Sequence, residues 1–157
     1  MTSMKRRIFL KGSLGAGAVG VAVSAGLLTP QAVLAAWPKA AFESKEVPAA
    51  LSALMGTDAT TPSADITIKA PDIAENGAVV PITVSTSMSG ISQIALVAEN
   101  NPFPLVAAFD LSGKALGFVS TRIKMGKTGD VIAVVKAGGK MYAARKGVKV
   151  TIGGCGG

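Results

Sequence analysis

The sequence predicts a mainly β protein, an immunoglobulin-like antiparallel β-sandwich with a short N-terminal helix and a flexible Gly-rich C-terminal arm. Three observations lead to this prediction. Apolar and polar residues alternate with a period of two from Ile66 onward, as they do in half-buried strands. Gly, Pro and Asn separate the alternating segments, which is typical of short strands joined by turns. No helical pattern lies between these segments, as a βαβ unit would require.

Residues 1–35 predict a signal peptide. This segment has a basic start, no acidic residue and a long uncharged stretch rich in Gly, which is the pattern of an export signal. Arg6 and Arg7, followed by Phe9-Leu10-Lys11, resemble the twin-arginine signal, which implies export in folded form to the periplasm. A membrane-spanning helix is the alternative for the uncharged stretch. Pro30 and the frequent Gly disfavour that alternative, so we expect no stable membrane insertion.

Residues 36–152 predict one domain that begins with a helix at 37–55. Pro38 suits the first position of a helix, and Pro48 indicates either a kink or the start of a second turn. The apolar stripe of this helix comprises Val47, Leu51, Leu54 and Met55. Gly56 suits the helix C-terminus.

Seven or eight short strands follow a polar loop at residues 57–64. The segments with strand character are 66–68, 78–85, 91–98, 105–111, 117–124, 131–136, 141–144 and 148–152. Pro81 predicts a sheet edge or a bulge, because Pro cannot donate to a strand ladder. Ala137-Gly138-Gly139-Lys140 predicts a tight hairpin turn. Gly126-Lys127-Thr128 resembles the end of a phosphate-binding loop, but Thr121 stands where that motif needs Gly.

The last five residues, 153–157, predict an arm that presents a thiol. Its glycines are Gly153, Gly154, Gly156 and Gly157. A segment this rich in Gly is costly to order, so we expect no stable element there. Cys155 lies three residues after Ile152, so its reach is at most about 10 Å. Because a thiolate is a nucleophile, Cys155 is the candidate for covalent attachment of a substrate.

The chain lacks the Cys and His side chains that most self-contained catalysis needs. The chain has one Cys and no His. A zinc site usually needs about four Cys or His ligands, and a Ser-His or Cys-His nucleophile pair needs an imidazole. We therefore expect a carrier without a cofactor or metal of its own, on which other enzymes act, and not an enzyme.

The charge is divided unevenly along the chain. Residues 36–110 hold 3 basic and 8 acidic residues, whereas residues 111–157 hold 9 basic residues and one acidic residue. Nucleic acid is not the expected partner, because the export signal and the lack of an aromatic platform argue against it. We interpret most of these cations as a solvated sheet face with Lys at strand edges. Their field would also favour anionic substrates and partners near the C-terminus.

The terminal Gly-Gly-Cys-Gly-Gly, with the preceding Val-Lys-Val-Thr-Ile, resembles the SoxY family, the carrier subunits of the bacterial thiosulfate-oxidising (Sox) system. Asn101-Pro102-Phe103-Pro104-Leu105 and Ala36-Trp37-Pro38-Lys39 also resemble that family. The resemblance implies that a c-type cytochrome joins Cys155 oxidatively to thiosulfate and that a hydrolase then releases sulfate. It further implies that a molybdenum sulfane dehydrogenase oxidises the remaining sulfur. A heterodimer with SoxZ, a β-sandwich subunit without the arm, is implied as well.

Two other interpretations of the C-terminus stay open. The chain could be an exported β-sandwich with a binding or structural role, whose Cys155 forms an intermolecular disulfide. A different class of sulfur carrier ends in Gly-Gly and uses a terminal thiocarboxylate, which Gly156-Gly157 would fit. That chemistry depends on ATP in the cytosol, however, and the signal peptide points to export.

Overall fold

The computed structural model describes residues 37–112 and 115–151. Apart from Trp37, these residues belong to one unit that begins at Pro38. The helices and strands are, in chain order, α2 (Lys39–Phe42), α3 (Val47–Met55), β1 (Thr61–Pro62), β2 (Ile66–Lys69), β3 (Ile73–Ala74), β4 (Val80–Thr86), β5 (Ile91–Ala98), β6 (Leu105–Asp110), β7 (Phe118–Ile123), β8 (Gly129–Ala137) and β9 (Lys140–Val150). The chain is therefore mainly β, as predicted.

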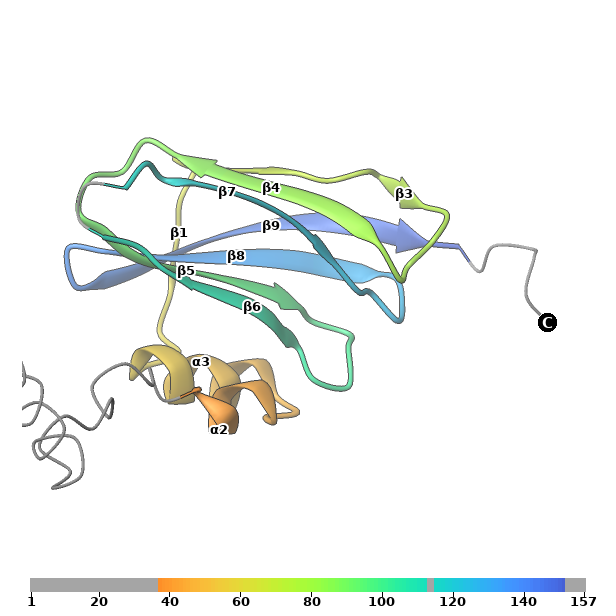
Figure 1. The fold of residues 1–157 in the computed structure, drawn as a ribbon, viewed down its shortest axis with the longest axis horizontal. Coiled ribbons are helices and arrows are strands. Elements are labelled where there is room, and N and C mark those ends of the chain that lie inside the picture. The colour runs from red at the N-terminus through yellow and green to blue at the C-terminus, as the bar shows by residue number, and fades with distance from the viewer. Residues whose placement is uncertain (1–36, 113–114, 152–157) are drawn as a thin grey trace, which may run out of the picture. The chain divides into compact units, whose positions relative to one another are not determined.

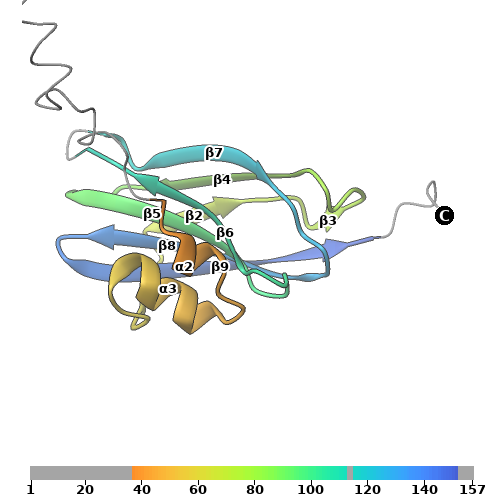
Figure 2. The same ribbon diagram turned by 60° about the horizontal axis from the view of Figure 1, so that its bottom comes forward.

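The strands form two sheets that pack face to face. The larger sheet has the order β1-β9-β8-β5-β6, with β3 also pairing with β9, and the smaller sheet has the order β2-β4-β7. Neighbours are antiparallel except β1 and β3, which both run parallel to β9. Figure 1 shows the smaller sheet on one face of the larger sheet and the two helices on the other face, and Figure 2 shows the same layers after rotation. This arrangement confirms the predicted β-sandwich.

Two apolar clusters hold these layers together. One fills the space between the two sheets, and the other lies between the larger sheet and the helices. The central strand β8 contributes to both clusters, with Ala133 and Val135 in the first and Ile132 and Val134 in the second. A strand that is covered on both faces reads as a continuous apolar run, and this explains why the sequence shows no alternation there.

The predicted N-terminal helix is in fact two short helices. Pro38 is the capping residue before α2 and not its first helical residue, so the prediction was wrong by one position. Pro48 lies in the first turn of α3, and Gly56 ends that helix with a φ of 87°, as predicted. Among the described residues, neither helix has the length and the apolar run that crossing a bilayer requires.

The prediction that Pro81 lies on an edge strand was wrong. It placed Pro81 at an edge or a bulge, but β4 is the central strand of the smaller sheet. The reason is that β2 is short: its last residue, Lys69, pairs with Thr83. Pro81 therefore has a neighbouring strand on one side only, where it pairs with Arg122 of β7. A residue without an N–H is tolerated there because a neighbouring strand is missing on one side.

The hairpin turn between β8 and β9 is confirmed. Ala137 pairs with Lys140, so the turn consists of two residues. Gly138 and Gly139 have φ angles of 56° and 78°. Positive φ at both positions is the geometry of a type I′ turn, which follows the twist of the strands and favours Gly because Gly has no Cβ.

Strand β9 is longer than predicted. We expected two strands, at 141–144 and 148–152, but β9 is continuous over 11 residues. It is held by β8, which pairs with β9 from Lys140 to Val148. The structure also adds β1 and β3, each of two residues, and β1 interrupts the loop expected at 57–64. Strands of two residues are too short for the alternation of apolar and polar residues to repeat, so the sequence pattern cannot reveal them. Strand β9 ends at Val150, and Ile152 lies outside the described residues.

Candidate functional site

The predicted attachment site lies just beyond the described part of the chain. Cys155 and its flanking glycines fall outside the described residues, as do Arg6 and Arg7 of the predicted signal. The last described residue is Thr151, at the end of the strand that leads to the arm. Cys155 is the fourth residue after Thr151, so at most about 14 Å of extended chain separates the two. The surroundings of Thr151 therefore determine where the arm starts.

On one side, the end of β9 is bonded to β3 and to the residue before it. The Lys149 N–H donates to the Asp72 carbonyl at 2.9 Å, and the Thr151 N–H donates to the Ala74 carbonyl at 3.0 Å. The Thr151 hydroxyl lies 3.5 Å from the same Ala74 carbonyl. These bonds carry the main chain of β9 to Thr151, and they exist because Ile73 and Ala74 pair in parallel with β9.

On the other side, Thr128 holds the last residue of β9 with its side chain. The main-chain ladder between β8 and β9 reaches Gly129 opposite Val148. Beyond that point the Thr128 hydroxyl accepts a hydrogen bond from the Val150 N–H at 2.9 Å and donates one to the Val150 carbonyl at 3.3 Å. One hydroxyl can do both because it carries one donor and two acceptor lone pairs. Thr128 therefore extends the ladder by two residues.

The loop that carries Thr128 is fixed by two asparagines that follow β5. The Asn100 amide donates to the Thr128 carbonyl at 2.8 Å. The Asn101 amide donates to the Lys124 carbonyl and its oxygen accepts from the Gly126 N–H, both at 2.8 Å. These bonds give a structural role to the segment Asn101–Leu105, which the sequence singled out. They also place the β5–β6 loop beside the origin of the arm.

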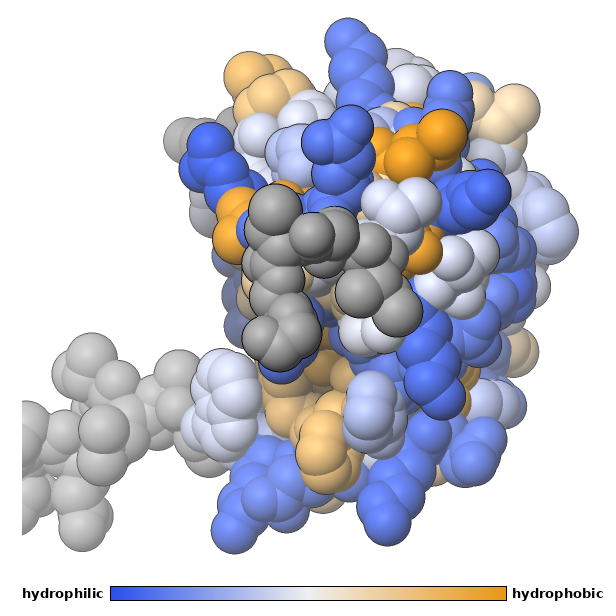
Figure 3. All heavy atoms as spheres, turned by 90° about the vertical axis from the view of Figure 1, so that its right-hand side faces the viewer, coloured by the Kyte–Doolittle hydropathy of each residue, from blue (hydrophilic) through white to orange (hydrophobic). Residues whose placement is uncertain are grey.

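The charge around the arm's origin is basic, with one ion pair. Lys124, Lys127 and Lys149 are exposed there, whereas Lys146 is bonded to the Asp72 carboxylate. The Lys146 ammonium, first through its hydrogen bond and then through its charge, holds the pKa of Asp72 below the ordinary value. Figure 3 shows this end of the molecule, where hydrophilic side chains predominate and apolar ones lie between them.

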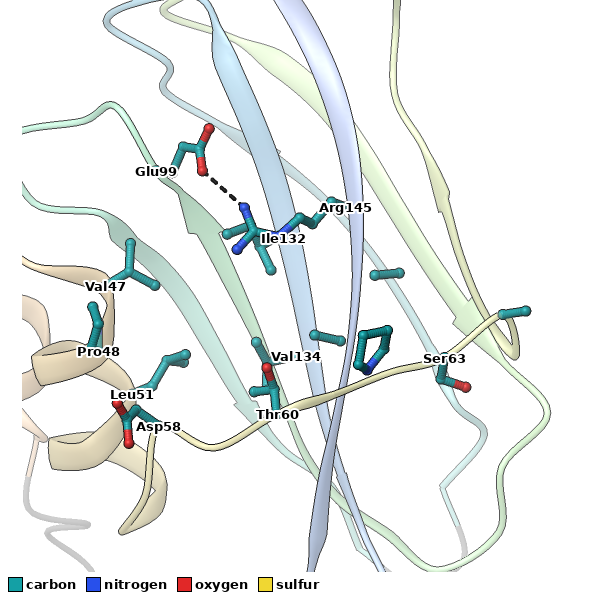
Figure 4. A pocket seen from close by; sticks show the side chains of 14 residues that line it. Val47, Pro48, Leu51, Asp58, Thr60, Ser63, Glu99, Ile132, Val134 and Arg145 are labelled. Carbon is teal, nitrogen blue, oxygen red and sulfur yellow. Dashed lines mark hydrogen bonds and ion pairs between the residues drawn. The ribbon is translucent and has the colours of Figure 1, made fainter.

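A groove that the sequence did not reveal lies between α3 and the outer face of the larger sheet. Its volume is about 800 Å³. Figure 4 shows Val47, Pro48 and Leu51 of α3 on one wall, with Ile132 and Val134 of β8 across from them. The signal that could have indicated a covered outer face is the continuous apolar run of β8.

The charged groups of the groove neutralise one another at one end. Arg145 donates to the Glu99 carboxylate at 3.1 Å (Figure 4). It also lies 3.8 Å from the Asp130 carboxylate. Arg145 is also five residues, about 17 Å of strand, before the end of β9. Among residues 37–112 and 115–151, no group of three His, Cys, Asp or Glu side chains could hold a metal.

Comparison with known families decides the family of this chain. The model of a family described as "Sulfur oxidation protein SoxY" matches residues 51–155, which is more than half of the chain. The chain belongs to the SoxY family. The matched range ends at Cys155, so the SoxY model extends through the arm to the predicted attachment residue. This confirms the resemblance noted in the sequence, and it supports a role as a sulfur carrier.

Solved structures agree with membership of the SoxY family. The sulfur carrier protein SoxY from Chlorobium limicola f thiosulfatophilum is 47% identical, with a TM-score of 0.60, over 66% of this chain and 94% of that one. A superoxide reductase (neelaredoxin) from Ignicoccus hospitalis is 23% identical, with a TM-score of 0.49, over 55% of this chain and 80% of that one. The second likeness is too weak to carry an argument. Comparison with curated proteins gave no match.

Proposed function

We propose that this SoxY protein carries sulfur intermediates covalently on Cys155 during thiosulfate oxidation in the periplasm. The observation that carries the proposal is the family match, which runs to Cys155, the sole thiol of the chain. The geometry supports it, because Thr151 is held by β3 and leaves four residues to reach the sulfur. A thiol on so short an arm can enter another protein while the sandwich stays outside.

The proposed first step joins the Cys155 thiolate to thiosulfate. A sulfur–sulfur bond forms between the Cys155 sulfur and the terminal sulfur of thiosulfate, giving Cys–S–S–SO₃⁻. Two electrons leave, and the resemblance assigns them to a c-type cytochrome. We assign the oxidant to this partner in keeping with the family, and we therefore propose a carrier on which other enzymes act.

The proposed second step is hydrolytic. Water attacks the sulfonate sulfur, the bond between that sulfur and its neighbour breaks, and the products are Cys–S–SH and hydrogen sulfate. The hydrolase of the system supplies the catalytic groups, and a molybdenum sulfane dehydrogenase can then oxidise the persulfide. We further propose that the carrier works as a heterodimer with a SoxZ-like subunit, in keeping with its family.

The test is the mass of the exported protein. Purified from cells grown on thiosulfate, it should carry sulfur adducts that vanish with reductant, and Cys155→Ser should carry none. The variant should unfold at the same denaturant concentration as the wild type, because Cys155 lies beyond the packed strands, and it should support no thiosulfate oxidation. A covalent dimer of two chains as the main oxidised species, with undiminished oxidation by Cys155→Ser, would contradict the carrier role.

A further inference from the structure

Strand β9 leads into the segment that carries Cys155, so the point at which β9 stops being held sets the length of the arm. The β8 ladder holds the strand as far as Val148, which is buried. If holding ended there, seven residues would lead to Cys155 and the reach would be about 24 Å. With Val150 and Thr151 also held, four residues lead to it and the reach is about 14 Å.

The holding after Val148 comes from both sides of the strand. On one side, Asp72 and the buried Ala74 of β3 accept the N–H groups of Lys149 and Thr151. On the opposite side, Thr128 bonds both the N–H and the carbonyl of Val150. The loop that carries Thr128 is fixed by Asn100 and Asn101. Val150 is therefore the residue that depends on the side chain of Thr128.

We propose that Thr128 is a positioning residue, which together with β3 forms a clasp around the end of β9, so that the carrier arm starts at Thr151 and not at Val148. The proposal rests on the proposed function, since it assigns the clasp a role in delivering Cys155. A shorter arm keeps the thiol at a higher effective concentration in a channel of matching depth. That concentration falls roughly as the −3/2 power of arm length, so lengthening from four to seven residues lowers it about twofold.

The chemistry at position 128 is specific to a hydroxyl. Thr128→Val has nearly the same shape but neither donates nor accepts, so Val150 loses both bonds. Thr128→Ser keeps the hydroxyl and should restore them. Thr67→Val is the matched control, because Thr67 is an exposed threonine on β2 of the smaller sheet.

Two measurements on the full mature chain test the clasp itself. Amide hydrogen exchange at Val150, whose N–H donates to the Thr128 hydroxyl, should accelerate about fivefold or more in Thr128→Val, the change expected from losing a hydrogen bond of ordinary strength. A spin label on Cys155 should become more mobile in the same variant. Thr128→Ser and Thr67→Val should match the wild type in both measurements. Unchanged exchange in Thr128→Val would overturn the proposal whatever the function of Cys155.

A third measurement links the clasp to delivery. With carrier loaded with thiosulfate as substrate, kcat of the sulfate-releasing hydrolase should fall about twofold for Thr128→Val, and KM should be unchanged because the surface of the sandwich is intact. A change in KM alone would overturn the proposal, since it would mean that Thr128 contacts the hydrolase directly. Turnover that is absent with every variant and with the wild type would refute the proposed function, while the exchange data would still judge the clasp.

Discussion

At the scale of single residues, Lys146 and Asp72 decide which charges surround the origin of the arm. Lys146 and Lys149 are the two basic residues nearest to the arm in the sequence. The charge of Lys146 is partly compensated, because Lys146 is paired with the Asp72 carboxylate. Lys149 lies nearer the end of β9 and is exposed. The basic field at the origin of the arm therefore comes more from Lys149 than from Lys146.

Replacing Lys146 with Gln should raise the pKa of Asp72 towards the value of an ordinary carboxyl group, near 3.9. Because the pKa is lower in the folded protein than in the unfolded chain, the pair stabilises the fold above the unfolded pKa. The contribution disappears as the pH falls through the lowered folded pKa. It is small, because the pair faces solvent. Nuclear magnetic resonance titration of Asp72 measures the shift, and Lys124→Gln is the control. An unchanged pKa in Lys146→Gln would refute the ion pair.

At the scale of elements, the sequence predicted most of the strands, although it divided β9 in two, and it missed the two-residue strands β1 and β3. Strand β5 was predicted at its observed bounds, because its ends coincide with turn residues. Strand β3 carries no pattern in two residues, yet it holds the end of β9. Thr128 was noticed only as part of a rejected motif. Its role depends on Val150, which is 22 residues away in the sequence, and local periodicity does not predict contacts between residues so far apart.

The short connection after β3 contains another contact between residues that are distant in the sequence, since Gly77 lies against the end of β9. A Cβ at this position would collide with the Met125 carbonyl and would lie 2.7 Å from Val150 Cγ1. Gly77→Ala should therefore lower the free energy of unfolding by about 1–3 kcal/mol, as overpacking does. Denaturation with urea measures the loss. Gly126→Ala is the matched control, because a Cβ there would have Asn101 Oδ1 as its nearest neighbour, at an ordinary 3.6 Å. Equal stability of the two variants would show that the backbone there moves apart easily.

At the scale of the whole molecule, the order of the strands bears on the export that we propose. Strand β9 is the last element, and it pairs with β1, β3 and β8. The larger sheet therefore cannot be completed until nearly the whole chain has been synthesised. A route that exports folded proteins suits such a chain, because the sheet can close before transport. This argument agrees with the twin-arginine resemblance of residues 1–35, which lie outside the described residues.

We therefore predict that changing both Arg6 and Arg7 to Lys will leave the precursor in the cytoplasm. The substitution keeps the positive charge of the signal and removes only the paired guanidinium groups, so a loss of export would indicate recognition of arginine itself. Fractionation of cells, followed by detection of the precursor and the mature chain, measures the result. The retained precursor should resist protease, because its sandwich can fold before transport. Lys5→Arg, which adds a guanidinium without touching the pair, should be exported as the wild type is. Normal export of the double variant would refute the twin-arginine assignment, and a protease-sensitive precursor would refute folding before transport.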